Sequence, residues 1–378
     1  MFFEEDRVHT GNRDRLFELA GLFTRLGFTA FGGPAAHIAM MHDEVVVRRR
    51  WIEEQHFLDM IGAVNLVPGP NSTELALHIG QVRAGWRGLL VAGCSFILPA
   101  VLIVGICAWA YVEYGSTPQA GALLYGVKPV IVAIVVQALW RLGRSALKTP
   151  LLAAAAVGVL LFYLLGANEL LLLFGVGALV AAGDRLWRRG VWALPGLGVV
   201  GLEGEPSLSQ LFGVFLKAGA LLYGSGYVLL AFLHNDLVVQ LGWLTHQQLL
   251  DAVAVGQFTP GPVFTTATFV GYVVAGVPGA LVATLGIFLP SFFLVAGLGH
   301  IVPWLRRTSW SAALLDGVNA AALGLMAGVS WQLGQTAVLD WLTALLAVGS
   351  YVVLTRWRIN SAWLVAAGAG VGLLQAIL

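Results

Sequence analysis

The chain has 378 residues and a net charge of +1, and 58% of its residues are hydrophobic whereas only 11% are charged. Soluble domains carry about 25% charged residues, so this composition excludes a water-soluble protein and indicates one embedded in a lipid bilayer. The net charge of +1 says nothing about partners, and a nucleic-acid partner is not expected.

Two of the first apolar segments are interrupted. After an N-terminal tail (1–14), too acidic for a signal peptide, segment 15–41 contains Gly32-Gly33-Pro34 and segment 57–82 contains Pro68-Gly69-Pro70. Proline removes a backbone donor and clashes with the preceding turn, and glycine permits unusual dihedral angles, so a helix has to stop and restart at both places. Uninterrupted apolar segments complete this half of the chain at 87–112, 121–140, 150–167 and 170–187.

The second half of the chain repeats the first. A shift of 192 residues places Pro68-Gly69-Pro70 on Pro260-Gly261-Pro262 and Gly32-Gly33-Pro34 on Gly224-Ser225-Gly226. After one deletion the shift becomes 191 residues, and it continues through the later apolar segments. We therefore expect, after the tail, a first transmembrane repeat at 15–187, a linker at 188–206 and a second repeat at 207–378.

Basic residues indicate how the two repeats are oriented. Loops that carry arginine in one half are neutral in the other, as at Arg48–Arg50 against Gln240–Gly242 and Arg306–Arg307 against Gly115–Ser116. Because Lys and Arg collect on the cytoplasmic side, the halves are expected to lie upside down relative to each other. The predicted fold is an all-α, polytopic integral membrane protein whose two homologous halves form an inverted repeat with interrupted, re-entrant helices. Inversion needs an odd number of crossings per half and six segments give an even number, so the exact count stays open.

A cation precedes the first break in both halves. Arg25 lies seven residues before Gly32, and Lys217 lies seven residues before Gly224. Charged side chains inside a bilayer usually face a cavity or a counter-charge, although both could instead extend to the membrane interface. Each helix that restarts after a break also presents unpaired N–H groups and the positive end of its dipole. Together these features predict an anion site in the middle of the membrane. The residues expected to form it are Arg25, Gly32, Gly33, Pro34, Pro68, Gly69, Pro70, Asn71, Ser72, Lys217, Gly224, Ser225, Gly226, Pro260, Gly261 and Pro262.

Ionisable residues near the breaks could couple transport to proton movement. The candidates are His37, Glu44, Asp59, Glu74 and Asp251. For Glu44 and its repeat counterpart Asp236, pairing with basic residues is the favoured role, whereas Glu74 is the best single coupling candidate although its counterpart is Thr266. The spacing of five residues between His37 and His42 does not suit one helical face, so no metal is expected. Because the chain has neither a phosphate-binding loop nor a nucleophile motif, it is expected to be no enzyme and to need no cofactor.

Two stretches resemble a known family. FTAFGGPAAHIAMMHDEVVVRRRW with the following PGPN segment, and YGSGYVLLAFLHNDLV with FTPGPVFTTATFVGYVV, are similar to the two halves of the long-chain chromate ion transporter (CHR) family. The resemblance covers nearly the whole chain outside the tail and the linker. Its motif residues fall on the break residues already named and, in addition, on His37, Glu44 and Trp51. The second copy lacks the proline of GGP and the asparagine of PGPN, so the halves need not contribute equally.

The resemblance implies a function. A member of this family is expected to be a secondary active transporter that exports chromate by alternating access and confers resistance in a prokaryotic cytoplasmic membrane. Sulfate has nearly the same shape and charge, so it is a possible counter-substrate or competitor, and transport of sulfate or another oxyanion is one alternative function. A passive anion channel is the other, and a homodimer is allowed.

Overall fold

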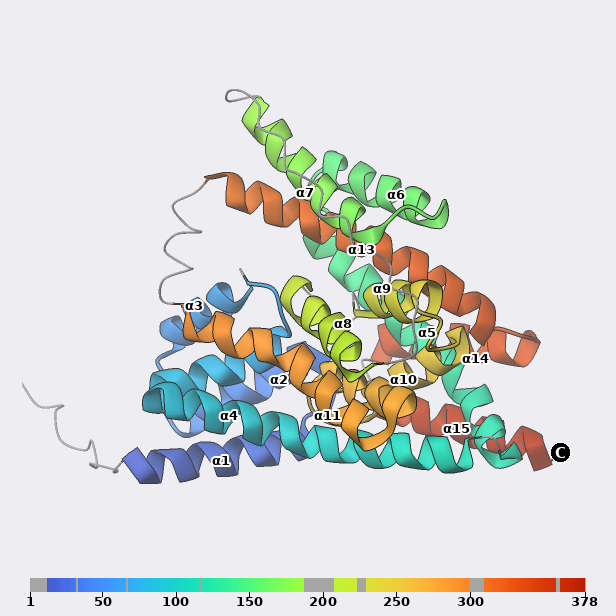
Figure 1. Cartoon of the computed structure of the whole chain (residues 1–378), viewed down its shortest axis with the longest axis horizontal. Coiled ribbons are helices and arrows are strands. Elements are labelled where there is room, and N and C mark those ends of the chain that lie inside the picture. Colours follow the sequence, from blue (N-terminus) through green and yellow to red (C-terminus); the bar gives the residue numbers. More distant parts are fainter. Residues whose placement is uncertain are drawn as a thin grey trace, which may run out of the picture.

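The computed structural model describes residues 12–31, 33–65, 67–115, 117–186, 207–222, 229–298, 309–357 and 361–377. Every regular element in these ranges is a helix (Figure 1), so the predicted all-α fold is confirmed. The first half contains α1 (Asn12–Thr29), α2 (Gly33–His42), α3 (Glu54–Val64), α4 (Asn71–Tyr114), α5 (Pro118–Ala146), α6 (Pro150–Leu164) and α7 (Glu169–Leu186). The second half contains α8 (Leu208–Leu221), α9 (Leu229–Leu233), α10 (His246–Phe258), α11 (Thr266–Ala296), α13 (Ser309–Ala337), α14 (Trp341–Trp357) and α15 (Ser361–Ile377).

The predicted helix breaks are present wherever the structure describes them. Between α1 and α2 the chain turns at Gly33, whose φ is 78°. Both Pro-Gly-Pro sequences lie outside helices: 68–70 separates α3 from α4, and 260–262 separates α10 from the short 3-10 helix η3 (Val263–Thr265). Gly32 and the predicted break at 224–226 lie outside the described residues.

Helix α4 is a hairpin rather than a straight rod. Gly80 and Gly88 would be about 12 Å apart along a straight helix, yet a Cβ added to Gly80 would lie 2.3 Å from the Gly88 carbonyl oxygen. The reversal occurs at Ala84 and Gly85, where Gly85 has φ 63° and ψ −152°. The short arm, 71–83, therefore runs back along the long arm, 86–114. At roughly 20 Å it is too short to cross a hydrocarbon core of about 30 Å, as expected for a re-entrant helix.

Helix α11 repeats this hairpin. Gly276 has φ 60° and ψ −151°, and a Cβ added to Gly271 would lie 2.3 Å from the Gly279 carbonyl oxygen. These three glycines stand 191 residues after Gly85, Gly80 and Gly88. In Figure 1 the long arms of α4 and α11 run in opposite directions across the molecule, as an inverted repeat requires.

The two halves also share a π-helix, which follows α2 in the first half and α9 in the second. These π-helices are η1 (Asp43–Arg48) and η2 (His234–Gln240). The turn after each π-helix places one residue in the left-handed region, Arg50 at φ 51° and its counterpart Gly242 at φ 61°. The repeat is therefore preserved in backbone conformation even where the residue type changes.

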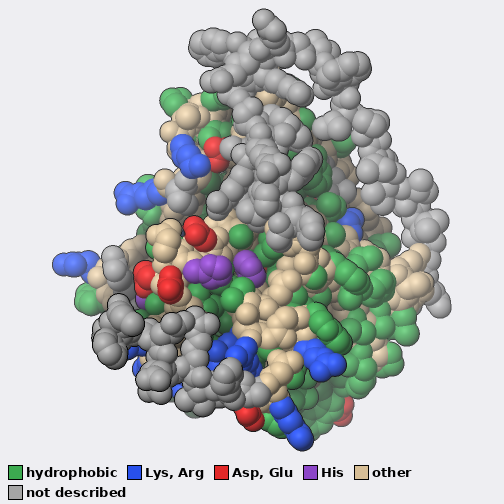
Figure 2. Space-filling view, turned by 90° about the vertical axis from the view of Figure 1, so that its left-hand side faces the viewer, with side chains coloured by type: hydrophobic (Ala, Val, Ile, Leu, Met, Phe, Trp, Pro, Cys, Tyr) green, Lys and Arg blue, Asp and Glu red, His purple; other side chains and the backbone are tan. Residues whose placement is uncertain are grey.

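The surface of the long arms fits a bilayer. Apolar side chains are exposed at intervals of four residues on α11, at Val277, Leu281, Leu285, Leu289 and Phe293. Within the described ranges, four helices are long and apolar enough to span a membrane, namely α4, α5, α11 and α13. In Figure 2, charged side chains and histidines gather on one end of the molecule, whereas hydrophobic side chains cover its flank. The chain is thus a multi-pass membrane protein whose flank faces lipid.

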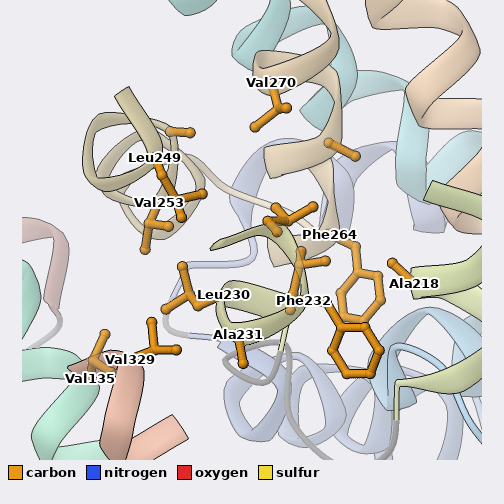
Figure 3. Close-up of a cluster of buried hydrophobic side chains, with 14 of the residues drawn as sticks. Val135, Ala218, Leu230, Ala231, Phe232, Leu249, Val253, Phe264, Val270 and Val329 are labelled. Atoms are coloured by element: carbon orange, nitrogen blue, oxygen red, sulfur yellow. The ribbon is translucent and has the colours of Figure 1, made fainter. Parts of the chain in front are cut away.

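One cluster of buried hydrophobic side chains contains residues from both halves. Figure 3 shows Phe232 of α9 and Phe264 of η3 beside Ala218 of α8, where the interrupted elements of the second half meet. In the same cluster Val135 of α5 lies near Val329 of α13, so helices from both halves contribute.

Candidate functional site

The described helix breaks of the two halves are joined by reciprocal backbone hydrogen bonds. The Gly69 N–H donates to the Leu222 carbonyl at 2.7 Å, and the Gly261 N–H donates to the Ala30 carbonyl at 2.9 Å. Residues 69 and 30 become 261 and 222 after the shift of 192, so the repeat relates the two bonds to each other. The last carbonyls of a helix have no partner within it. Here the carbonyls at the ends of α1 and α8 each accept a hydrogen bond from the Pro-Gly-Pro loop of the opposite half.

Close packing makes glycine necessary in both loops. Gly261 has φ 88°, and a Cβ there would lie 2.6 Å from Ala100 Cβ. At Gly69, with φ 139°, an added Cβ would lie 2.9 Å from Ser291 Oγ. Ala100 and Ser291 are themselves repeat counterparts on the long arms of α4 and α11. Each loop is thus pressed against the long arm of the other half.

His37 links α2 to the start of α4. The imidazole is buried, with Nε2 3.0 Å from the Ala30 carbonyl and Nδ1 3.3 Å from Ser72 Oγ. A carbonyl oxygen only accepts, so Nε2 carries a proton, and in the neutral ring Nδ1 accepts from the Ser72 hydroxyl. The counterpart of His37 is Leu229, so this link is specific to the first half.

The N-terminus of α4 opens onto the same region. Pro70 is its N-cap and provides no side-chain cap. The N–H groups of Thr73 and Glu74 donate to the Pro70 carbonyl, which leaves those of Asn71 and Ser72 without a partner in the helix. Asn71 donates from Nδ2 to Asn65 Oδ1 at 2.6 Å, while Ser72 and Thr73 are buried. The positive end of the helix dipole and a set of amide and hydroxyl groups therefore converge beside the Gly69 loop.

The predicted cations are found in ion pairs. Arg25 Nη2 lies 2.7 Å from Glu44 Oε1, and Lys217 Nζ lies 2.5 Å from Asp236 Oδ2. The two pairs are related by the shift of 192. The sequence favours pairing with basic residues for both acids but does not specify the partner. Neither cation is therefore a free charge in this state, and Arg25 is half-exposed, with 49% of its side chain accessible. Glu44 also binds Arg48 and Arg49, whereas Lys217 is the cation that contacts Asp236.

The two predicted aspartates differ. Asp59 is exposed, whereas its counterpart Asp251 is buried, with Oδ1 3.0 Å from Lys128 Nζ and Oδ2 accepting from Tyr111 at 2.8 Å. These three groups line a cavity of about 340 Å³ between α4, α5, α10 and α13. Sequence reasoning missed Lys128, although it is the only charged residue between Pro118 and Trp140. An isolated charge in an apolar span signals a functional or paired residue.

A further polar cluster lies beside the Lys217 pair. His234 Nε2 is 2.9 Å from His246 Nδ1, and the hydroxyl of Tyr163 is 3.2 Å from His234 Nδ1. In the first half the counterparts of the two histidines are His42 and Glu54, whose side chains also meet, at 2.8 Å. The same two positions are therefore in contact in both halves, as a His–His pair in the second half and a His–Glu pair in the first.

Comparison with known proteins gives a consistent result. A family model described as Chromate transporter matches the chain twice, over residues 17–182 and 209–373. The chain is 32% identical to the chromate transport protein of Cupriavidus metallidurans, over 96% of this chain and 93% of that protein. It is also 32% identical to the chromate transport protein of Pseudomonas aeruginosa, over 84% and 81%. An uncharacterized transporter of Methanocaldococcus jannaschii is 24% identical, over 89% of each. No solved structure matches the chain significantly.

Proposed function

The chain belongs to the chromate transporter family, a family of transporters and not of enzymes, and from this premise we propose that it exports chromate across a prokaryotic cytoplasmic membrane. Transport is secondary active and proceeds by alternating access around a site at the interface of the two halves. Sulfate, a tetrahedral dianion of similar size, serves as the counter-substrate, so that the protein exchanges one oxyanion for the other.

The reciprocal bonds between the breaks carry this proposal. They bring the start of α4, with Asn71, Ser72 and Thr73, to the meeting point of the halves near Gly69 and Gly261. Unpaired N–H groups at a helix start bind tetrahedral oxyanions without a metal. Among the described residues, the two reciprocal bonds are the backbone–backbone hydrogen bonds between the halves, so few such bonds would be exchanged during a rocking motion of one half against the other.

The ion pairs supply the remaining positive charge. Arg25 and Lys217 each hold a single carboxylate in this state. An arriving dianion competes with Glu44 and Asp236 for these cations, which favours a second arrangement of the pairs when substrate is bound. Binding of the anion thereby contributes the free energy for the conformational change.

Purified protein in liposomes tests the function. Labelled chromate trapped inside should leave when sulfate or chromate is present outside and should remain when the outside solution lacks oxyanion. A passive channel would instead release chromate down its gradient without any external oxyanion. If sulfate neither supports efflux nor competes with chromate, the counter-substrate is a different anion and the exchange with sulfate is wrong.

A further inference from the structure

Glu74 occupies an unusual position at the meeting point of the two halves. It lies in the short arm of α4 and is fully buried. A Cβ at Gly69 would lie 2.1 Å from Glu74 Oε1 and 2.9 Å from Ser291 Oγ, so the carboxyl group sits between the Gly69 loop and the long arm of α11. It is therefore next to the helix start at which the oxyanion is proposed to bind.

The carboxyl group of Glu74 has no charged partner among the described residues. No cation lies within ion-pair distance of its oxygens, and the polar group that faces it is the Ser291 hydroxyl, which does not meet the geometry of a full hydrogen bond. The other buried carboxylates in the described ranges do have partners: Glu44 has Arg25, Asp236 has Lys217, Asp251 has Lys128 and Glu169 has Asn235. An ionised carboxylate buried without a partner is far more costly than a neutral one, so Glu74 holds a proton in this state.

No nearby ionisable group in the described residues forms an ion pair with Glu74. His37 of α2 is hydrogen-bonded to Ala30 and Ser72. His78, one turn further along the short arm, has no hydrogen bond at Nδ1, and His56 of α3 beside it disfavours a positive charge on its ring. The side that α11 presents is the uncharged Ser291. Arg25 on α1 and Lys217 on α8 are held by their own acids, so none of these groups replaces the proton on Glu74.

We propose that Glu74 is the proton carrier of the transporter and that one proton moves with each divalent oxyanion in the same direction. An ionised Glu74 would repel a dianion from the neighbouring helix start, so the anion binds only when the carboxyl group is protonated. When the site opens to water without substrate, Glu74 releases its proton. The counterpart Thr266 is polar but cannot ionise, which limits the coupling to one proton per molecule. This inference rests on the proposed oxyanion transport.

Sulfate is the appropriate probe because it remains a dianion at neutral pH, whereas chromate itself takes up a proton there. Equilibrium exchange of labelled sulfate is measured in liposomes with the same pH on both sides. In the wild-type protein the rate should fall as pH rises, by at most about tenfold per unit for one linked proton. The variant Glu74→Gln, whose amide imitates the protonated carboxyl group, should exchange sulfate with no such decline. Glu113→Gln, at the exposed end of the same helix, should keep the wild-type pH profile.

Proton uptake on sulfate binding provides a second measurement that does not depend on the variant. Weakly buffered wild-type protein in detergent should take up one proton for each sulfate bound at a pH where the substrate-free site is ionised. Proton release, no proton change at any pH, or a Glu74→Gln variant with the wild-type pH profile would each overturn the inference. Absence of any oxyanion exchange by the wild-type protein would instead refute the proposed function.

Discussion

Lys128 and Asp251 form a buried ion pair that crosses from one half of the chain to the other, with 3.0 Å between Nζ and Oδ1. Lys128 belongs to α5 of the first repeat, and Asp251 belongs to α10 of the second. The repeat does not reproduce this pair, because the counterparts are Asn319 and the exposed Asp59. This contact therefore breaks the symmetry between the two repeats.

Loss of one partner of this pair should be more harmful than an exchange of the two charges. Lys128→Met leaves Asp251 buried without a cation, which typically costs about 3–5 kcal/mol, and we expect lower thermal stability in detergent and weak chromate transport. Exchanging the charges, with Lys128→Asp and Asp251→Lys together, should recover part of both properties. Asp59→Asn removes the equivalent exposed acid and should leave stability unchanged. Equal losses for the single and the exchanged variants would contradict a role for the pair itself.

Removal of Arg25 and of Lys217 should have unequal effects on stability. Arg25→Ala leaves Glu44 with Arg48 and Arg49, so the variant should reach wild-type abundance. Lys217→Ala leaves buried Asp236 without its cation and should lower the unfolding temperature. Chromate uptake into inverted membrane vesicles should be lost in both variants, because the proposed site loses one of its two cations. Normal uptake by both would exclude these residues from substrate binding.

Gly261 allows a direct test of the close approach between the halves. Gly261 and Gly166 share a φ of 88°, but only at Gly261 would a Cβ meet another residue, Ala100, at 2.6 Å. Gly166→Ala should cost about 1–2 kcal/mol from backbone strain alone. Gly261→Ala adds a steric overlap at the Ala30 bond, and we expect it to abolish transport as well as reduce thermal stability. Similar behaviour of the two variants would show that the contact is dispensable.

The orientation of the halves can be tested by labelling. Single cysteines at Gly115, after α4, and at Gly242, after η2, should both react with a membrane-impermeant maleimide added outside intact cells. The native cysteines, Cys94 and Cys107, would first be replaced by serine. Labelling of one site from outside and of the other only after lysis would refute the predicted arrangement in the membrane.

The backbone interruptions were predictable because they depend on local residue types. Pro68-Gly69-Pro70 and its copy cannot continue a helix, and the regular offset of their surroundings revealed the repeat. The pair of Lys128 and Asp251 was not predictable in the same way, because its members lie 123 residues apart in different repeats. Likewise, a sequence pattern shows that Arg25 and Lys217 are retained together, but only the packing of α1 against the following π-helix determines which acids they meet.

The paired bonds at Gly69 and Gly261 have a consequence for how the chain can be divided. A fragment that ends in the linker would keep its own broken helices but would lack both the donor for Ala30 and the acceptor for Gly69. Each fragment alone would then leave backbone N–H and carbonyl groups without hydrogen-bond partners inside the membrane. When the two fragments are produced together in one cell, each provides the hydrogen-bond partner that the other lacks. We therefore expect the covalent linker to be dispensable and the two bonds between the halves to be essential.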